Sequence, residues 1–586
     1  IPDMLSNMTG TLRISDKGIQ TKRIKADLLG QPGQLAVQTL QRKGLPERRD
    51  IIVKAVGEFD ARELSAQRFP VMKDLVDGRS PWEIMLSVPS GGDTKTRRNV
   101  QLAVSTRLRG VAINLPPPFE KQHADSRALE LFMDIKDARH MMLKVSYADK
   151  FAGIFEGNTA APLWVVRGDV RLGGGPVVLP ATRGLRIAGR LKELSVDIWK
   201  TLIEQTIDQY ERDAKPDTLR TTNAKSTAAH MALVNAIDLN IDNFEVFGQQ
   251  VKKLKLKVNN KEKWLAAEVD SEQLQGTIIV PANLDTNPLE FDMQQVRITS
   301  AEAGGAKPDP RELPGIVFNS RSFTYDNKKL GAVAFELAKT NNGLLLQQLI
   351  VRPRATTVKG HGFWLVEQGQ PKSMFEFVLD SDDLGKTMKD LGYVDTISGG
   401  QGTISAKLHW PGSIIDPDLH SINGNVELDF EDGRILDIEP GGAARLFGLF
   451  SLQTLPRRLT LDFSDLFGKG LGFDTIHGQF KVESGDAYTN NFDLQGPSAD
   501  VSLSGRIGLG SQDYDQRIRV TPHITDSAIL LSIITSQPLL FFFQQLLKED
   551  FDKATSFEYS LTGPWDNYKL EPLVNEVPLA PDTEEF

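Results

Sequence analysis

The feature that most constrains this chain is an alternation of apolar and polar residues that runs unbroken from Ile476 to Val520. Short turn sequences such as Ser484-Gly485-Asp486 and Gly496-Pro497 separate the alternating runs. This period and this turn chemistry predict a β-meander. Because successive side chains of a strand point to opposite faces, so many alternating strands make one broad apolar face and one broad polar face. Something must cover the apolar face.

The same hairpin unit recurs along the chain. Residues 10–28 predict one hairpin, and residues 424–438 predict another, because Asp432-Gly433 is a strong two-residue turn signal. Two longer stretches, 243–269 and 322–351, resemble one another. A repeated strand unit without a propeller-like period indicates an elongated stack in which each strand contacts only its neighbours. We therefore expect a mainly β fold: a long, twisted, predominantly antiparallel sheet forming a repeating β-groove, with an open apolar trough and a few short helices.

Helical spacing is confined to short segments. One stripe comprises Ile198, Trp199, Leu202, Ile203, Ile207 and Tyr210, and residues 382–391 and 443–452 are shorter candidates. We expect the first stripe to pack onto the sheet, with gating of a ligand as the alternative.

Composition excludes some classes of function. The chain has 586 residues, a formal net charge of −9, and basic and acidic residues interleaved along the strands, which argues against a nucleic-acid partner. It contains no cysteine, as is typical of envelope or periplasmic proteins that avoid unwanted disulfides, although cysteine-free cytosolic proteins exist. Since Ile1 is not a natural start, we expect any membrane anchor to lie upstream of this sequence.

No catalytic or metal-binding pattern stands out. The eight histidines are scattered, with no spacing of three or four that would place two on one helix face. Residues 173–176, Gly-Gly-Gly-Pro, lack the Lys and Ser/Thr of a phosphate loop and read as a turn between strands. We expect no enzyme, no metal and no cofactor.

One segment has the length of a membrane span. Residues 528–547 are uncharged, but polar residues interrupt them and Pro538 would bend a helix there. We interpret them as two short helices forming an apolar tip that either contacts a membrane or caps the end of the sheet. The predicted membrane-contacting residues are Leu530, Leu531, Ile533, Ile534, Leu539, Leu540, Phe541, Phe542, Phe543 and Leu546.

Residues 446–467, LFGLFSLQTLPRRLTLDFSDLF, resemble the signature of the YhdP family of AsmA-like proteins from Gram-negative envelopes. Weaker matches extend the resemblance over nearly the whole chain, at residues 108–111, 115–118, 189–191, 197–199, 382–385, 391–393, 432–434, 495–499, 513–515 and 561–565. The resemblance implies a repeating β-groove protein, anchored in the inner membrane by a segment absent from this chain. It also implies that the protein crosses the periplasm and conducts phospholipid toward the inner leaflet of the outer membrane, or toward a partner there.

An apolar trough would hold acyl chains, since each buried methylene contributes about 0.8 kcal/mol. The alternative is a scaffold that bridges the two membranes with a dry core, which needs the same alternation. The representative groove residues that we predict are Leu254, Leu256, Val258, Val333, Phe335, Leu337, Ile404, Ala406, Leu408, Val426, Leu428, Phe430, Val501 and Leu503.

The sequence also suggests a division of the chain. We expect groove segments at 1–212, 230–380 and 381–523, the last of them AsmA-like. A flexible linker at 213–229, the apolar helical tip at 524–552, and a terminal strand and tail at 553–586 complete the division.

Overall fold

A computed structural model describes the protein over most of its length. The described residues are 5–16, 18–21, 23–42, 45–68, 73–90, 99–137, 139–158, 164–203, 233–246, 248–261, 263–300, 309–390, 397–414, 417–436, 471–497, 499–523 and 556–573. They form strands β1 to β32 and only short helices, which confirms the predicted mainly β class. The chain separates into two compact units, residues 1–283 and 284–586. The predicted segment boundaries stay predictions, and the predicted linker lies outside the described residues.

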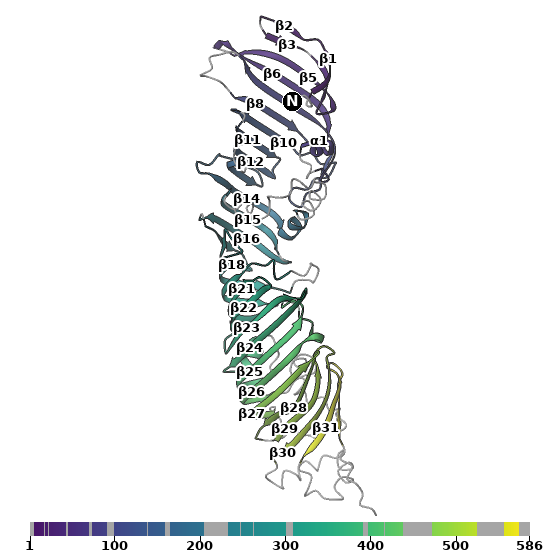
Figure 1. The fold of residues 1–586 in the computed structure, drawn as a ribbon, viewed down its shortest axis with the longest axis vertical. Helices are drawn as coiled ribbons and strands as arrows, with labels where there is room; N and C mark the ends of the chain where they lie inside the picture. The colour runs from purple at the N-terminus through teal and green to yellow at the C-terminus, as the bar shows by residue number, and fades with distance from the viewer. Residues whose placement is uncertain are drawn as a thin grey trace, which may run out of the picture. The chain divides into compact units, whose positions relative to one another are not determined.

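The first unit is a sheet in which most strands pair with their neighbours in the sequence (Figure 1). Its strands are β1 (Leu5–Gly10), β2 (Arg13–Ser15), β3 (Gly18–Gln20), β4 (Ile24–Leu28), β5 (Gln31–Arg42), β6 (Leu45–Asp60), β7 (Val76–Ser90), β8 (Val100–Thr106), β9 (Val111–Ile113), β10 (Leu129–Ile135), β11 (His140–Tyr147), β12 (Phe151–Asn158), β13 (Val165–Leu172), β14 (Gly184–Ser195), β15 (Val234–Val246), β16 (Gln249–Asn260), β17 (Trp264–Asp270) and β18 (Leu274–Pro281).

Pairing in this unit is antiparallel except around β14, which runs parallel to both β13 and β15. Parallel neighbours start at the same edge of a sheet, so the chain must return across the sheet between them. Residues 173–183, which include the Gly-Gly-Gly-Pro turn, make one of these returns. The sheet is therefore mixed, although predominantly antiparallel as predicted.

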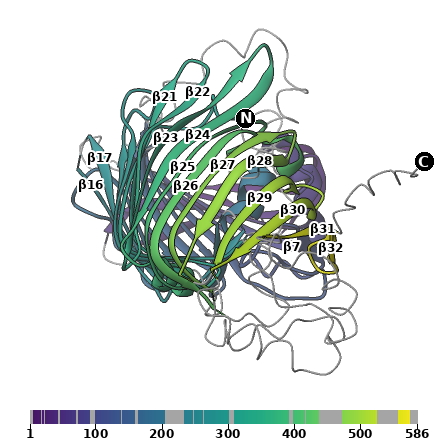
Figure 2. The same cartoon turned by 90° about the horizontal axis from the view of Figure 1, so that it is seen from below.

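The second unit follows the same plan. Its strands are β19 (Leu289–Ile298), β20 (Ile316–Tyr325), β21 (Lys328–Thr340), β22 (Gly343–Arg352), β23 (Thr356–Glu367), β24 (Gln370–Ser381), β25 (Ile397–Pro411), β26 (Asn423–Ile435), β27 (Leu471–Glu483), β28 (Asp486–Gln495), β29 (Ala499–Gly508), β30 (Asp513–Pro522), β31 (Phe557–Pro564) and β32 (Lys569–Pro572). Only the β19–β20 pair is parallel among the described pairs. Viewed from below, strands β21 to β30 lie side by side as a curved sheet (Figure 2).

The meander predicted between Ile476 and Val520 is confirmed as β27 to β30. The hairpin predicted over residues 424–438 is wrong, because β26 continues through Asp432 and Gly433 to Ile435. Asp432 takes a φ of 55° inside the strand, opposite Gly399 and Gly400, whose φ values are also positive. The ring of Phe473 covers Gly433, where a Cβ would lie 2.2 Å from Cζ. The strand keeps its register with β25 and β27 on both sides of the Asp-Gly pair and does not turn.

Among the described residues, three short α-helical segments and one 3-10 helix, η5 (Leu419–Ser421), accompany the strands. Helix α1 (Ala61–Arg68) joins β6 to β7, residues 196–203 are helical after β14, and α4 (Leu384–Asp390) joins β24 to β25. Of the predicted stripe, Trp199 packs against Phe119, whereas Ile198 and Ile203 are half exposed. Within the described part of the chain, no helix has both the length and the apolar character to cross a membrane.

Candidate functional site: the apolar face

In the first unit, cross-strand pairing aligns apolar side chains into continuous rows on one face. We define the central row as the residues that pair in register from β4 to β18: Ile24, Leu35, Ala55, Ile84, Val104, Leu131, Val145, Gly153, Val170, Ile187, Ile237, Val258, Ala267 and Ile278. No polar residue interrupts this row, and none of its members is exposed.

Two further rows flank the central row. The inner row comprises Val37, Val53, Leu86, Leu102, Met133, Leu143, Phe155, Gly168 and Leu185. The outer row comprises Ala26, Gly33, Gly57, Trp82, Thr106, Leu129, Tyr147, Phe151, Leu172, Gly189, Leu239, Leu256, Val269 and Gly276. Since paired residues lie on the same face, the three rows form one apolar surface.

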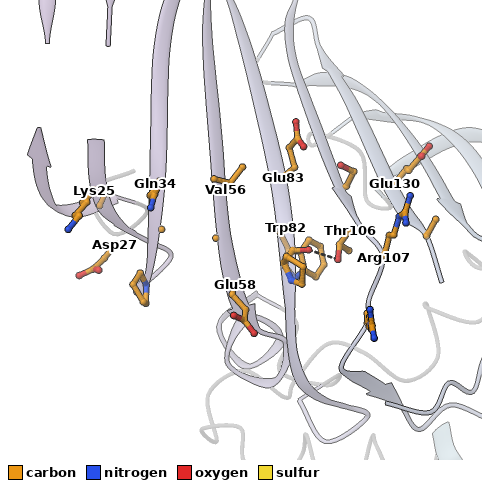
Figure 3. Close-up of a pocket in the computed structure, with 18 of the residues that line it drawn as sticks. Lys25, Asp27, Gln34, Val56, Glu58, Trp82, Glu83, Thr106, Arg107 and Glu130 are labelled. Carbon is orange, nitrogen blue, oxygen red and sulfur yellow. Dashed lines mark hydrogen bonds between the residues drawn. The ribbon is translucent and has the colours of Figure 1, made fainter. Parts of the chain in front are cut away.

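The opposite face of the same strands is mixed, with charged residues between apolar ones such as Val56 and Met85. There the in-register residues Lys25, Gln34, Glu83 and Glu130 line a cavity of about 1350 Å³ together with Arg107 and with the outer-row residues Trp82 and Thr106 (Figure 3). Its lining carries charges of both signs, so this cavity does not suit an acyl chain. The contrast between the two faces is the alternation seen in the sequence.

The second unit repeats the arrangement. We define the phenylalanine row as Phe291, Phe318, Phe335, Leu349, Gly360, Phe377, Ala406, Val426 and Phe480, which pair in register from β19 to β27. The rings of Phe318 and Phe335 stack with centroids 4.8 Å apart, and that of Phe291 lies 5.9 Å from Phe318. Phe291, Phe318, Phe335, Leu349 and Phe377 are half-buried, so their apolar surface is only partly covered.

All fourteen predicted groove residues lie on these apolar faces, and none is exposed. Leu256 belongs to the outer row and Val258 to the central row, while Leu254 pairs with Ile241 beside them. In the second unit Phe335, Ala406 and Val426 belong to the phenylalanine row. Val333, Ile404 and Leu428 form the next row with Leu379, and Leu337, Leu408, Phe430, Val501 and Leu503 lie in rows that also pair in register. Whether they contact a ligand stays a prediction.

Burial differs among the predicted residues. Phe335, Ile404, Leu408, Val426 and Leu428 are half-buried, whereas Val501 and Leu503 are 6% and 2% exposed. The latter two belong to a buried cluster with Phe492, Leu494 and Ile518. A ligand would therefore meet the first group directly.

The sequence interpretation missed the rows between residues 24 and 190. The alternation that could have revealed them is present, for example at Trp82, Ile84, Leu86 and Val88 in β7. The predicted tip residues of 528–547, and the signature at 446–467, lie outside the described residues.

Chain segments of the first unit cover part of its apolar face. Ala61 of α1, Val111 of β9 and Phe119 of the following loop pack with the outer-row residues Trp82 and Tyr147. Phe119 also meets the edge of Trp199 at 6.0 Å, and the Trp199 indole donates to the carbonyl of Pro117. These segments form a cap over the outer row between β7 and β12.

A buried lysine stabilises the cap through hydrogen bonds to its backbone. Lys121 is 1% exposed, and its Nζ donates to the carbonyls of Val111 at 2.6 Å and Gln122 at 2.9 Å. Burial lowers the pKa of the Lys121 ammonium. Because its hydrogen-bond acceptors among the described residues are both backbone carbonyls, this buried cation orders the cap and is not available to a ligand.

One cluster of possible metal ligands lies in the second unit. The donor atoms of Glu427, Asp429 and His477 lie within 4.8 Å of one another. The Asp429 carboxylate, hydrogen-bonded to His477 Nδ1 at 2.6 Å, raises the pKa of that imidazole. Glu427 and Asp429 are exposed and alternate with the apolar residues of β26, so the cluster lies on the polar face.

Each unit is an open sheet with an apolar face, formed by strands that pair largely in chain order, and this arrangement defines a β-groove protein. The YhdP protein family matches residues 2–570, so the chain belongs to that family. It is also similar to the protein named intermembrane phospholipid transporter YhdP from Escherichia coli (strain K12), with 24% identity over 261 residues. That alignment covers 44% of this chain and 20% of the relative, so the chain matches about a fifth of its length. No solved structure matches the chain.

Proposed function

We propose that the apolar faces of the two units conduct phospholipid, with acyl chains lying on the rows and headgroups remaining in water. The observation that carries this proposal is the central row, which has no polar member across all its strands. A dry core would bury its residues completely, yet Ile84, Val104, Leu131 and Val145 of this row are only half-buried. Covering such surface with acyl chains is favourable by about 25 cal/mol per Å².

The length of the central row suits a file of lipids. From β4 to β18 without β9 there are 14 strands and 13 steps between neighbours. At ~4.8 Å per step the row extends about 60 Å through the sheet. One leaflet of a bilayer has a hydrocarbon depth of about 15 Å, half of the ~30 Å core, so the row exceeds the length of one acyl chain several times.

The relative's printed name supports the same function, and we extend it to this chain only as a proposal. In this proposal the protein works in the periplasm and is held at the inner membrane by a segment absent from this sequence. It delivers lipid to the inner leaflet of the outer membrane, or to a partner there, through residues 528–547. Neither a catalytic residue nor a cofactor is needed, because the lipid moves unchanged.

Site-specific photocrosslinking tests the proposal. A photoreactive amino acid replaces Phe335 or Leu428 on the apolar face, and Glu336 or Glu427, exposed on the same strands, provides the matched control. We expect crosslinked phospholipid at the first pair and none at the second. Equal labelling at both pairs, or none at either, contradicts a lipid-conducting face.

The scaffold alternative has one observation in its favour. Around β27 to β30 most of the apolar face is buried, with Leu494 at 0% and Phe492 at 1% exposure. A scaffold predicts that the half-buried rows bind no lipid and that the purified chain yields no co-extracted phospholipid. Mass spectrometry of an organic extract separates the two functions.

A further inference from the structure

The strands of the first unit end at two edges that differ in what they carry. We define the capped edge as the one from which α1, the β9 loop and the 196–203 helix leave the sheet. We define the hairpin edge as the opposite one, with the β10–β11 turn, the start of β14 and the β16–β17 turn. The cap therefore extends over the apolar face from one side only.

The cap leaves the half of the face toward the hairpin edge accessible. Phe119, Val111 and Ala61 pack on the outer row, which is the row nearest the capped edge in β7 and β12. In the central and inner rows, Val104, Leu131 and Leu143 are half-buried. An acyl chain beside β8 to β11 would therefore lie on these two rows, with its headgroup at the hairpin edge.

The hairpin edge presents cations without acidic partners. Lys136 and Arg139 flank the β10–β11 turn, Arg183 precedes β14, and Lys261 and Lys263 lie in the β16–β17 turn; all five are exposed. None of the five side chains forms an ion pair with a described residue. The nearby Asp137 is engaged by the backbone N–H groups of Arg139 and His140 and by the His140 ring. These bonds, that of Arg139 N–H first, lower the pKa of Asp137 to about 2.

Some cations at the capped edge have acidic partners. Lys253 pairs with Glu272 at 2.9 Å, Arg62 lies 3.6 Å from Asp74, and Arg127 lies 3.9 Å from Asp125. Arg107, Arg109 and Lys252 are exposed at the same edge and form no ion pair with a described residue. Near the hairpin edge, the carboxylate of Glu156 already has a cationic partner, Arg167. The cap covers the apolar face only beside the capped edge, so the unpaired cations of the hairpin edge lie on the side where a headgroup would emerge.

We propose that the hairpin edge of the first unit binds the phosphate of a phospholipid headgroup and favours lipids of net negative charge. This inference rests on the proposed function, because it places the headgroup of the same lipid whose acyl chains occupy the rows. The five cations border the path at three places, the β10–β11 turn, the start of β14 and the β16–β17 turn, so a lipid would pass from one phosphate contact to the next as it moves along the sheet. Ammonium and guanidinium groups at such an edge attract anionic headgroups and are screened by salt.

The test compares lipid pick-up by the whole chain from vesicles of phosphatidylglycerol, phosphatidylethanolamine or uncharged diacylglycerol. The variant carries Lys136→Gln, Arg139→Gln, Arg183→Gln, Lys261→Gln and Lys263→Gln. The matched control carries Arg62→Gln, Lys253→Gln and Lys255→Gln, which remove cations that have acidic partners. A second variant, Lys261→Gln with Lys263→Gln alone, guards against loss of folding, which circular dichroism monitors.

In the variant with all five substitutions, phosphatidylglycerol pick-up should fall at least tenfold. In the control variant it should change less than twofold. Diacylglycerol pick-up should stay unchanged in both variants. Equal phosphatidylglycerol pick-up by variant and wild type, or an equal loss in the control, overturns the inference while leaving the lipid-conducting face intact. If wild-type protein takes up no lipid, including diacylglycerol, the proposed function itself fails. Glycerophosphate in millimolar excess serves as the free-phosphate arm; if it abolishes pick-up, the edge is a site for soluble phosphate and the assignment to lipid is wrong.

Discussion

A single arginine on the apolar face of β26 should block lipid passage while leaving the sheet folded. Leu428 is half-buried and pairs with Ile404, whereas its neighbour Glu427 is exposed and accepts a hydrogen bond from Gln479 on the other face. In Leu428→Arg, a guanidinium must share the row with acyl chains. Arginine in the centre of a hydrocarbon layer costs about 3 kcal/mol, and each 1.4 kcal/mol changes an equilibrium tenfold.

The occupancy of the position by lipid should therefore fall about 100-fold, and at least about tenfold if the arginine reaches water by bending its stem. Because all lipid moving along this unit passes β26, transfer should fall by a similar factor. Loss of the half-buried leucine should reduce the free energy of unfolding by only about 1 kcal/mol. The assay is transfer of acyl-labelled phospholipid between vesicles, with Glu427→Arg as the same-strand control and Leu428→Met as the apolar control.

Both controls should transfer lipid at the wild-type rate. If Leu428→Arg folds normally and transfers lipid as fast as Glu427→Arg, the rows do not form the path. Reduced transfer together with a melting temperature that falls by many degrees would instead mean that the row is a structural core.

Three further outcomes follow from named contacts. Replacing Lys121 with Met should destabilise the cap by about 1–3 kcal/mol, because the Val111 and Gln122 carbonyls lose a buried hydrogen-bond donor. Limited proteolysis should then cut first within residues 108–128, and Lys150→Met serves as the control. Gly433→Ala should lower the free energy of unfolding by about 1–3 kcal/mol, because its Cβ would overlap the Phe473 ring, while Gly412→Ala meets no atom and tests the effect of a positive φ alone. The hydrogen bond with Asp429 raises the folded-state pKa of His477, so the stabilisation that it gives is complete below the unfolded pKa of about 6.5 and is lost as the pH rises through the folded pKa. This stabilisation should stay under about 1 kcal/mol because both groups are largely exposed. Urea unfolding of His477→Gln from pH 5 to 9 should lack this pH dependence.

Period-two alternation determined most of what the sequence could predict. It places Val426, Leu428 and Phe430 on one face of β26 and Glu427 and Asp429 on the other, because strand geometry permits no other arrangement. The prediction of a turn at Asp432-Gly433 was wrong because packing of the Phe473 ring and pairing with the two glycines of β25 hold these residues inside a strand. A local turn signal carries no information about a partner strand that is distant in the sequence.

The parallel strand β14 and the cap were also beyond the sequence interpretation. Strand direction follows from where the chain re-enters the sheet, and Gly184 to Ser195 alternate equally well in either direction. The cap depends on contacts such as Phe119 with Trp199, which are eighty residues apart and have no periodic signal. The contrast between the two edges depends in turn on knowing which strand ends lie together.

Pairing of nearly every strand with its neighbour in the sequence has a consequence for how the length of such a sheet can change. Most strands contact only the strands directly before and after them, so adding or removing one antiparallel hairpin inserts or deletes two strands and leaves the remaining pairs in register. Each hairpin alters the sheet by about 10 Å, while the apolar rows on either side rejoin without a change of face. The length of the sheet in each unit is therefore set by the number of hairpins that the unit contains.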